Sequence, residues 1–257
     1  MLNDLGDGVF RIILNRPAKR NAMDFAARKA LVDALDATNG KAKVLIITGA
    51  GTSFCAGMDL KEVASGEAYD VGDAVRRRTM WTNVQHEIRA HPSIVIAAVN
   101  GYALGGGVTL INTSDLAIAA DEALIGMPEA SFGLYPGVAG PSTQLRLLPK
   151  HAAWMVLTAS RINGQTAEAW GLVNRSVPRE TLDEESEVLA RQIAAYDPVT
   201  LEWCKRSLQQ VPGNIAEWRA ALEYGESVGT QIRARTERLD QELGALTDGR
   251  GNSGRRT

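Results

Sequence analysis

Three glycines, Gly105–Gly107, follow an apolar strand-like run at Ser93–Val99 and open a predicted helix at Gly106–Thr113. Glycine lets the main chain approach a ligand closely, and the first amides of a helix have no acceptor within the helix. The segment therefore predicts main-chain donors that face a ligand. It is not a dinucleotide-binding turn, because G-x-G-x-x-G would need glycine at Leu110. The chain also lacks the G-x-x-x-x-G-K-S/T pattern of a phosphate loop.

A second loop of small residues, Gly49–Leu60, follows the strand predicted at Lys43–Thr48. Ala56 or Gly57 in this loop could offer a main-chain amide to a ligand. Cys55 lies between them and the strand, with no histidine nearby in sequence to act as a base. A nucleophilic role is therefore not favoured, and we expect a small buried hydrophobic residue there.

A third segment, Gly126–Gly137, places the carboxylate of Glu129 among apolar and glycine residues. Partial burial raises the pKa of a carboxylate and suits it to proton transfer near neutral pH. An isolated glutamate more often caps a helix or faces solvent. The acid/base role of Glu129 is therefore indicated only in combination with the other two segments.

Taken together, these segments resemble the crotonase, or enoyl-CoA hydratase/isomerase, family. The resemblance covers nearly the whole chain. The blocks that carry it are Asn15–Ala22, Phe54–Leu60, Val99–Gly107, Ser114–Asp115, Pro128–Glu129 and Gly171–Asn174. Their order and spacing make the signal specific, although no single block is.

The resemblance implies an α/β fold: a crotonase-like spiral of ββα units with a C-terminal helical trimerisation region. Residues 1–195 would form the spiral core, 196–246 the helical region and 247–257 a disordered tail. The implied substrate is an acyl-CoA, and the implied assembly is a homotrimer or a hexamer of two trimers. No cofactor is implied, because coenzyme A is part of the substrate.

The resemblance also assigns residues. The amides of Ala56 and Gly106 would form an oxyanion hole for the thioester carbonyl, and two such donors stabilise an enolate by roughly 3–4 kcal/mol each. Glu129 would be the acid/base, beside Thr109. The predicted contacts to coenzyme A and the acyl group are Lys19 or Arg20 at the phosphates, Ala22, Ala56, Gly57, Met58, Asp59, Leu60, Gly106 and Phe132.

One departure from the family pattern concerns the chemistry. Family hydratases use two glutamates, and Thr109 stands at the position of one of them, whereas Glu129 matches the other. A threonine hydroxyl orients water but is a poor general acid or base. The expected activity is therefore of the enoyl-CoA hydratase/isomerase type, with Glu129 as the single acid/base.

Several reactions stay open. A single base suffices for Δ3–Δ2 enoyl-CoA isomerisation, and Glu129 could also hydrate while Thr109 holds the water. Hydroxycinnamoyl-CoA hydratase-lyases resemble the second arrangement, but their phenol-binding tyrosine is replaced by Val63 here. Thioester hydrolysis, decarboxylation and a non-catalytic acyl-CoA-binding role are further alternatives.

The elements that must position these residues follow from the hydrophobic pattern. Asp24 is placed to cap a helix at Phe25–Thr38, and Met80, Trp81, Val84 and Ile88 share a helical face within Asp70–Ala90. Further strands are expected at Val9–Asn15, Leu116–Ala120 and Ala123–Gly126. Helices are expected at His151–Ala159, Thr166–Gly171, Leu182–Tyr196, Val199–Gln210 and Ile215–Glu237. Side chains of Val63–Trp81, with Phe132, Leu134, Tyr135 and Val138, are candidates for the acyl pocket.

Composition excludes other classes. The 257 residues carry a formal net charge of −2, so no bulk positive field would attract nucleic acid or an anionic membrane. Met1–Phe10 has no apolar signal region, and the apolar runs are too short to cross a bilayer. Two cysteines without CxxC spacing and three scattered histidines indicate no metal site. We therefore expect a cytoplasmic enzyme.

Overall fold

The computed structural model describes residues 1–65 and 73–214, together with Ser227 and Ala234. The chain divides into two compact units, Met1–Tyr196 and Asp197–Thr257. Most of the predicted helix Ile215–Glu237 and the whole predicted tail 247–257 lie outside the described residues. The limits proposed for the C-terminal helical region stay a prediction. Within the described part of the chain, no helix is both long enough and apolar enough to cross a membrane.

The first unit is built on a six-stranded sheet in the order β1-β2-β3-β5-β7-β10. Its strands are β1 (Leu2–Asp4), β2 (Val9–Leu14), β3 (Val44–Gly49), β5 (Ile94–Val99), β7 (Leu116–Ala120) and β10 (Arg175–Val177). Only the β1–β2 pair is antiparallel. Every residue of β3 and β5 is buried, which explains their continuous apolar sequences, because a parallel sheet is covered on both faces.

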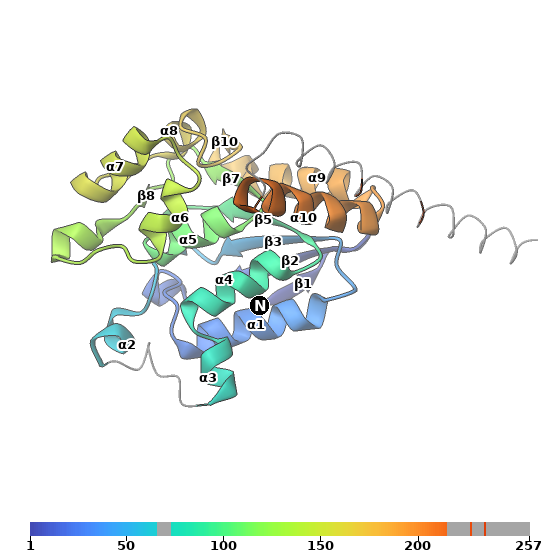
Figure 1. Cartoon of the computed structure of the whole chain (residues 1–257), viewed down its shortest axis with the longest axis horizontal. Coiled ribbons are helices and arrows are strands. Elements are labelled where there is room, and N and C mark those ends of the chain that lie inside the picture. The colour runs from blue at the N-terminus through green and yellow to red at the C-terminus, as the bar shows by residue number, and fades with distance from the viewer. Residues whose placement is uncertain (66–72, 215–226, 228–233, 235–257) are drawn as a thin grey trace, which may run out of the picture. The chain divides into compact units, whose positions relative to one another are not determined.

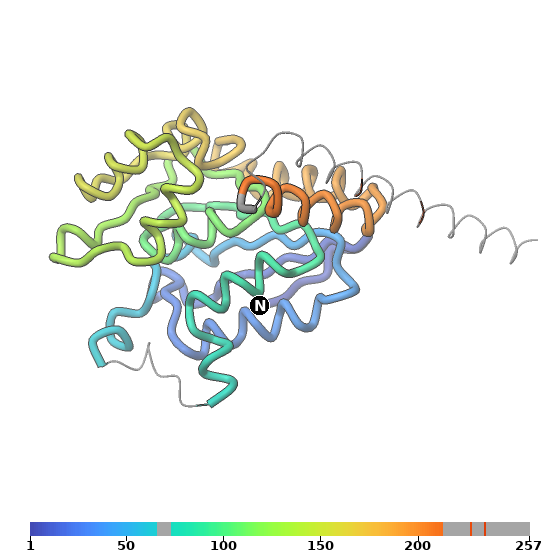
Figure 2. Tube along the Cα trace, viewed as in Figure 1, coloured from blue at the N-terminus to red at the C-terminus, as the bar shows by residue number. Residues whose placement is uncertain are grey.

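A second sheet has four short strands in the order β4-β6-β8-β9. They are β4 (Ser53–Cys55), β6 (Tyr102–Leu104), β8 (Ile125–Gly126) and β9 (Arg161–Ile162). The first three each follow a strand of the large sheet and precede a helix: α2 (Leu60–Ser65), α5 (Gly106–Thr113) and the 3-10 helix η3 (Pro128–Phe132). This repetition, which can be followed along the trace in Figure 2, is the predicted spiral of ββα units.

The remaining helices cover the sheets. They are α1 (Phe25–Thr38), α3 (Ala74–Arg78), α4 (Trp81–Ala90), α6 (Ala139–Gln144), α7 (Pro149–Thr158), α8 (Gly164–Ala169) and α9 (Leu182–Ala194), with the 3-10 helices η1 (Pro17–Lys19) and η4 (Arg179–Thr181). In the second unit, α10 spans Pro198–Asn214. Helix α9 packs on β3, β5 and β7, while α1 and α4 lie together on the other side of the sheet (Figure 1).

Helix starts follow the predicted chemistry. Helix α1 begins and ends where the sequence predicted, and the Asp24 carboxylate accepts a hydrogen bond from Ala27 N–H at 2.8 Å. The single segment expected at Asp70–Ala90 is instead two helices in its described part. Helix α3 ends at Arg78, and α4 begins at Trp81 after an extended Met80.

Buried asparagines fix the crossings between the two sheets. The Asn100 amide donates to the Gly49 carbonyl at 2.7 Å, and its oxygen accepts from Gly49 N–H at 3.2 Å. The Asn21 amide donates to the Ser53 carbonyl at 2.7 Å. A Cβ on Gly101 would lie 2.1 Å from the Thr52 oxygen, so the two crossings pack main chain on main chain. This contact brings the loop after β4 beside the turn after β6.

Candidate functional site

The two predicted amide-bearing segments meet at Gly57 and Gly106. A Cβ on Gly57 would lie 3.0 Å from the Gly106 nitrogen, and a Cβ on Gly106 would lie 3.1 Å from the Gly57 Cα. A Cβ on Gly107 would lie 2.1 Å from the Cys55 oxygen, so a side chain there would push α5 away from β4. The glycines are therefore required by contact between two main chains, and the Gly57 conformation at φ +90° also favours glycine.

Hydrogen bonding decides which amide of the first loop is free. Ala56 N–H donates to the Arg20 carbonyl at 2.9 Å, and Gly57 N–H points to the Cys55 sulfur at 3.4 Å. The predicted Ala56 donor is therefore already engaged within the protein. The next amide, Met58 N–H, has no hydrogen-bond partner among the residues that the structure describes.

The geometry of Met58 explains its free amide. Met58 forms a parallel bridge with Met23, in which Met23 N–H donates to the Gly57 carbonyl and Asp59 N–H donates to the Met23 carbonyl. In an extended chain, successive N–H groups point to opposite sides. Because the groups of Gly57 and Asp59 face Met23, the Met58 N–H faces away from it.

Gly106 contributes the second amide. It is the first residue of α5, and Gly105 before it donates its own N–H to the Gly126 carbonyl at 3.0 Å. The first N–H groups of a helix have no intrahelical acceptor and carry the positive end of the helix dipole. Within the described part of the chain, Gly106 N–H has no acceptor outside its helix either, so the two available amides come from neighbouring main chains.

Glu129 lies at the start of η3 and packs against Gly105, the residue before the first amide of α5. A Cβ on Gly105 would lie 2.5 Å from Glu129 Oε1, so only glycine leaves room for this carboxylate. Glu129 Oε2 is buried, and no described residue forms a hydrogen bond with it. Burial raises the pKa of Glu129, opposed by a smaller effect of a main-chain hydrogen bond. A carboxylate with a raised pKa is suited to moving a proton.

Thr109 is fully buried one turn into α5. Its hydroxyl points to the Gly105 carbonyl at 3.4 Å, the residue against which Glu129 packs. The hydroxyl proton is directed into the helix, so its lone pairs are left to accept a hydrogen bond. A threonine hydroxyl in this arrangement can accept a hydrogen bond but is a poor proton-transfer group.

The loop between β4 and α2, which contains Met58 and is called the Met58 loop below, is held by charged side chains. The Asp59 carboxylate accepts from Lys61 N–H at 3.1 Å and pairs with the Arg16 guanidinium at 3.2 Å. These two donors hold the pKa of Asp59 below its usual value, with Lys61 N–H the larger effect. Arg16 also pairs with Asp24 at 2.8 Å and so ties the loop to the start of α1.

A buried arginine that the sequence did not single out joins three further elements. Arg28 is only 2% exposed, and it donates to Glu62 in α2, to the Met23 carbonyl and to the Thr79 carbonyl. Glu62 in turn accepts from Phe25 N–H at 2.6 Å. Arg28 therefore links the partner strand of Met58 to the turn that precedes Trp81.

The predicted contacts to coenzyme A are distributed around the same loop. Lys19 is exposed at the end of η1, and the Arg20 guanidinium lies 5.3 Å from the centre of the Tyr102 ring. Arg161, which the sequence did not single out, lies 5.8 Å from the same ring. Ala22 is half-buried, and Leu60 and Phe132 are exposed. Three cations are thus available near a face that a phosphate could approach.

The candidates for the acyl pocket are only partly described, because residues 66–72 lie outside the described residues. Trp81 is buried, and its indole Cε2 and Cζ2 atoms each lie 3.3 Å from the Cβ position of Gly106. Leu134 and Tyr135 are exposed. Trp81 is therefore placed beside Gly106.

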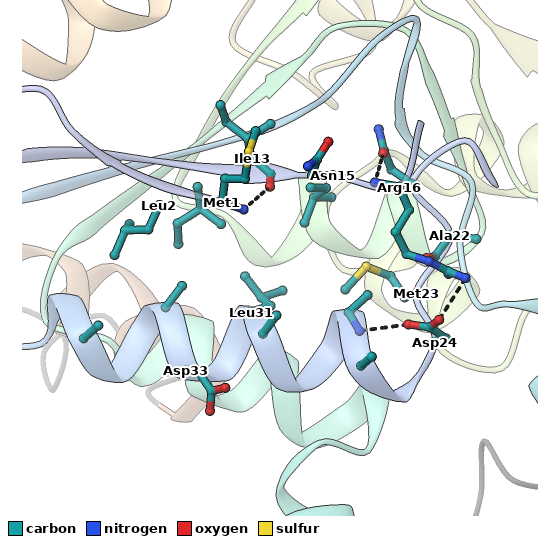
Figure 3. A pocket seen from close by; sticks show the side chains of 18 residues that line it. Met1, Leu2, Ile13, Asn15, Arg16, Ala22, Met23, Asp24, Leu31 and Asp33 are labelled. Atoms are coloured by element: carbon teal, nitrogen blue, oxygen red, sulfur yellow. Dashed lines mark hydrogen bonds and ion pairs between the residues drawn. The ribbon is translucent and has the colours of Figure 1, made fainter. Parts of the chain in front are cut away.

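A cleft of about 670 Å³ lies behind the Met58 loop, between β1, β2 and α1. Figure 3 shows Met23, Leu31 and Ile13 on its walls, with Arg16 and Asp24 at one end. Neither Glu129 nor Gly106 lines it. The cleft therefore adjoins the rear of the loop and is separate from the free amides.

Cys55 is fully buried, and desolvation raises the pKa of its thiol to about 12. At neutral pH it is a neutral, apolar group and not a nucleophile. This agrees with the interpretation of Cys55 as a small buried hydrophobic residue.

The burial of the Glu129 carboxylate should make the stability of the protein depend on pH. Since the folded state raises the pKa of Glu129, folded protein binds its proton more tightly than unfolded protein does. Stability then falls as pH rises from the ordinary glutamate pKa through the raised one. Glu129→Gln should therefore raise the melting temperature relative to wild type at pH 8, and the gain should shrink towards pH 4. Exposed Glu122→Gln is the control, and an equal gain at both pH values would contradict the desolvation of Glu129.

Comparisons with known proteins identify the family. A family model described as enoyl-CoA hydratase/isomerase matches residues 4–221. Hydroxycinnamoyl-CoA hydratase-lyase of Pseudomonas fluorescens is 35% identical over 216 residues, covering 80% of this chain and 77% of the relative. The 2,3-dehydroadipyl-CoA hydratase of Escherichia coli K12 is 37% identical over 206 residues, covering 79% and 78%.

Solved structures share the fold. The crystal structure of human enoyl Coenzyme A hydratase domain-containing protein 3 superimposes with a TM-score of 0.84 and 29% identity, covering 96% of this chain and 97% of that one. The predicted crotonase fold is thereby confirmed. On the family match, the sequence relatives and the fold together, this chain belongs to the enoyl-CoA hydratase/isomerase family, the crotonases.

Proposed function

We propose that this protein hydrates 2-enoyl-CoA thioesters, with Glu129 as the only acid/base and with Met58 and Gly106 N–H as the oxyanion hole. The observation that carries the proposal is the position of Glu129. Its carboxylate packs on Gly105, has a raised pKa, and adjoins the residue whose amide would hold the thioester oxygen. Met58 takes the place of Ala56, because the Ala56 amide is engaged by Arg20.

The two amides supply the electrostatic part of the catalysis. Negative charge develops on the thioester oxygen when a nucleophile adds to C3 or when a proton leaves C2. Fixed N–H donors that face this oxygen stabilise it by roughly 3–4 kcal/mol each in mutational studies of such sites. The close contact of Gly57 with Gly106 supports this role, since it fixes both donors before substrate binds.

The proton steps then need one carboxylate. The oxygen of water bonds to C3 while one of its protons passes to the Glu129 carboxylate, and the electron pair of the double bond moves to the thioester oxygen. Neutral Glu129 returns the proton to C2, which restores the carbonyl and the carboxylate. Thr109 accepts a hydrogen bond from the second water proton through its free lone pairs.

Two relatives support hydration in name, since one is a hydratase-lyase and the other a hydratase. Isomerisation is the second candidate. The observation in its favour is that the Thr109 hydroxyl proton points to the Gly105 carbonyl, so Glu129 is the single proton-transfer group that we assign. One base suffices to move a proton between C2 and C4 of an enoyl thioester.

Two substrates separate these candidates. Hydration of crotonyl-CoA removes the conjugated thioester and lowers its ultraviolet absorbance, whereas isomerisation of a 3-enoyl-CoA raises that absorbance. We expect a loss of absorbance with crotonyl-CoA. A gain with the 3-enoyl thioester and no loss with crotonyl-CoA would instead assign isomerisation. No change with either substrate would contradict both activities.

Variants then test the assigned groups. Glu129→Gln should lower kcat roughly 10³-fold with little change in acyl-CoA affinity, because a general acid/base acts in the transition state. Thr109→Ala should lower kcat by about five- to tenfold, the effect of one lost hydrogen bond, and Thr109→Ser should retain activity.

The pH dependence of wild-type activity tests the same carboxylate. Activity should fall on the acid side at a pH above the ordinary glutamate pKa, since Glu129 must be ionised to accept a proton. Near wild-type activity in Glu129→Gln, with Glu122→Gln as control, would exclude the proposed base.

We also propose that the protein assembles as a trimer or a hexamer of two trimers. The support is a group of exposed apolar side chains on neighbouring elements η3, α6 and α7 and their flanks: Phe132, Leu134, Tyr135, Leu145, Leu148, Trp154 and Leu157. Contiguous exposed apolar side chains are typical of interaction surfaces. Sedimentation velocity should give a threefold or sixfold mass, and a monomer at micromolar concentration would contradict the assembly. A cytoplasmic location and the lack of a cofactor stay predictions of the sequence.

A further inference from the structure

Five buried side-chain polar atoms in the described residues have no hydrogen-bond partner. They are Arg11 Nε, Trp81 Nε1, Asn112 Oδ1, Glu129 Oε2 and His151 Nδ1. Two of the five belong to side chains that pack on adjacent glycines of one turn, since Glu129 contacts Gly105 and Trp81 contacts Gly106. One of these atoms is an acceptor and the other is a donor, so the turn has unpaired groups of both kinds beside it.

The indole of Trp81 packs on the turn through the part of the ring that adjoins its N–H group. Its Cε2 and Cζ2 atoms are the ones nearest the Gly106 Cβ position, at 3.3 Å, and Cε2 is bonded to Nε1. The side chain is only 7% exposed. A tryptophan in a core usually finds an acceptor for its N–H when it is this deeply buried. This N–H is therefore available to an acceptor that a ligand carries to Gly106.

The thioester oxygen does not need this donor. A carbonyl oxygen has two lone pairs, and the amides of Met58 and Gly106 occupy both in the proposed oxyanion hole. The next oxygen in the proposed reaction is the one that joins C3, as water in one direction and as a hydroxyl group in the other. That oxygen gives one proton to Glu129 and donates a hydrogen bond to Thr109 with the other. Its remaining lone pair still lacks a hydrogen-bond donor.

We propose that Trp81 Nε1–H donates a hydrogen bond to the oxygen on C3 of the acyl group and makes the site selective for 3-hydroxyacyl-CoA thioesters. This inference rests on the proposed function for the placement of the thioester carbonyl. When water adds, one lone pair of its oxygen forms the bond to C3 and the other accepts from Trp81. When the hydroxyl group leaves, the same N–H stabilises the charge that develops on it.

The test compares two ligands that differ by one oxygen. Binding of butyryl-CoA and of each enantiomer of 3-hydroxybutyryl-CoA is measured by calorimetry with wild type and with Trp81→Phe, which keeps an aromatic ring and removes the N–H. We expect wild type to bind one 3-hydroxybutyryl enantiomer about tenfold more tightly than butyryl-CoA. Trp81→Phe should bring the ratio of the two affinities close to one, and Trp170→Phe should keep it.

The possible outcomes separate this inference from the proposed function. A preference that depends on Trp81, with no turnover of crotonyl-CoA, would support the donor and overturn hydration. Turnover of crotonyl-CoA without the preference in wild type, or with the preference kept in Trp81→Phe, would overturn the donor alone. Should Trp81→Phe not fold, the wild-type ratio decides, and a ratio near one there overturns the inference. Failure of both ligands to bind would overturn both proposals.

Discussion

The site depends on contact between two main chains, at Gly57 and Gly106. The first lies in the loop after β4 and the second at the start of α5, and each would clash with a side chain on the other. Such contact needs both crossings between the sheets to be fixed, and buried Asn21 and Asn100 fix them through carbonyls of the chain. Donors held in this way need no reorganisation when charge develops on a substrate oxygen.

Charge is distributed around this contact in two layers. Inside, Glu129 is a carboxylate in an apolar setting, and burial raises its pKa. Outside, Asp59 has a lowered pKa because Lys61 N–H and Arg16 hold its charged form. The same kind of group, a carboxylate, is thus suited to proton transfer where it is desolvated and holds a loop in place where it is paired. The desolvated group is a cost to stability that the surrounding sheet and helices offset.

Sequence pattern predicted the parts of the fold that depend on local signals. Helix α1 with its Asp24 cap, helix α5 and strand β7 have the predicted bounds, because capping residues and apolar runs mark them. Strands β4, β6 and β9 have two or three residues each and arise from pairing with distant segments, so no periodicity marks them. The engagement of the Ala56 amide was equally out of reach, since it depends on a hydrogen bond to the carbonyl of Arg20 in a distant segment. Trp81 ends the segment Val63–Trp81 that the sequence offered for the acyl pocket, but its contact with Gly106 and its Nε1, which has no partner among the described residues, could be found only in the structure.

We propose that Met58 and Gly106, and not Ala56, hold the thioester oxygen beside Glu129. A crystal structure of the Glu129→Gln protein with crotonyl-CoA would locate this oxygen, because the variant should bind the thioester without turning it over. We expect the thioester oxygen at about 3 Å from both Met58 N and Gly106 N, with C2 and C3 facing the substituted side chain at position 129. A thioester oxygen bonded to Ala56 N, or lying away from the Gly57–Gly106 contact, would contradict it.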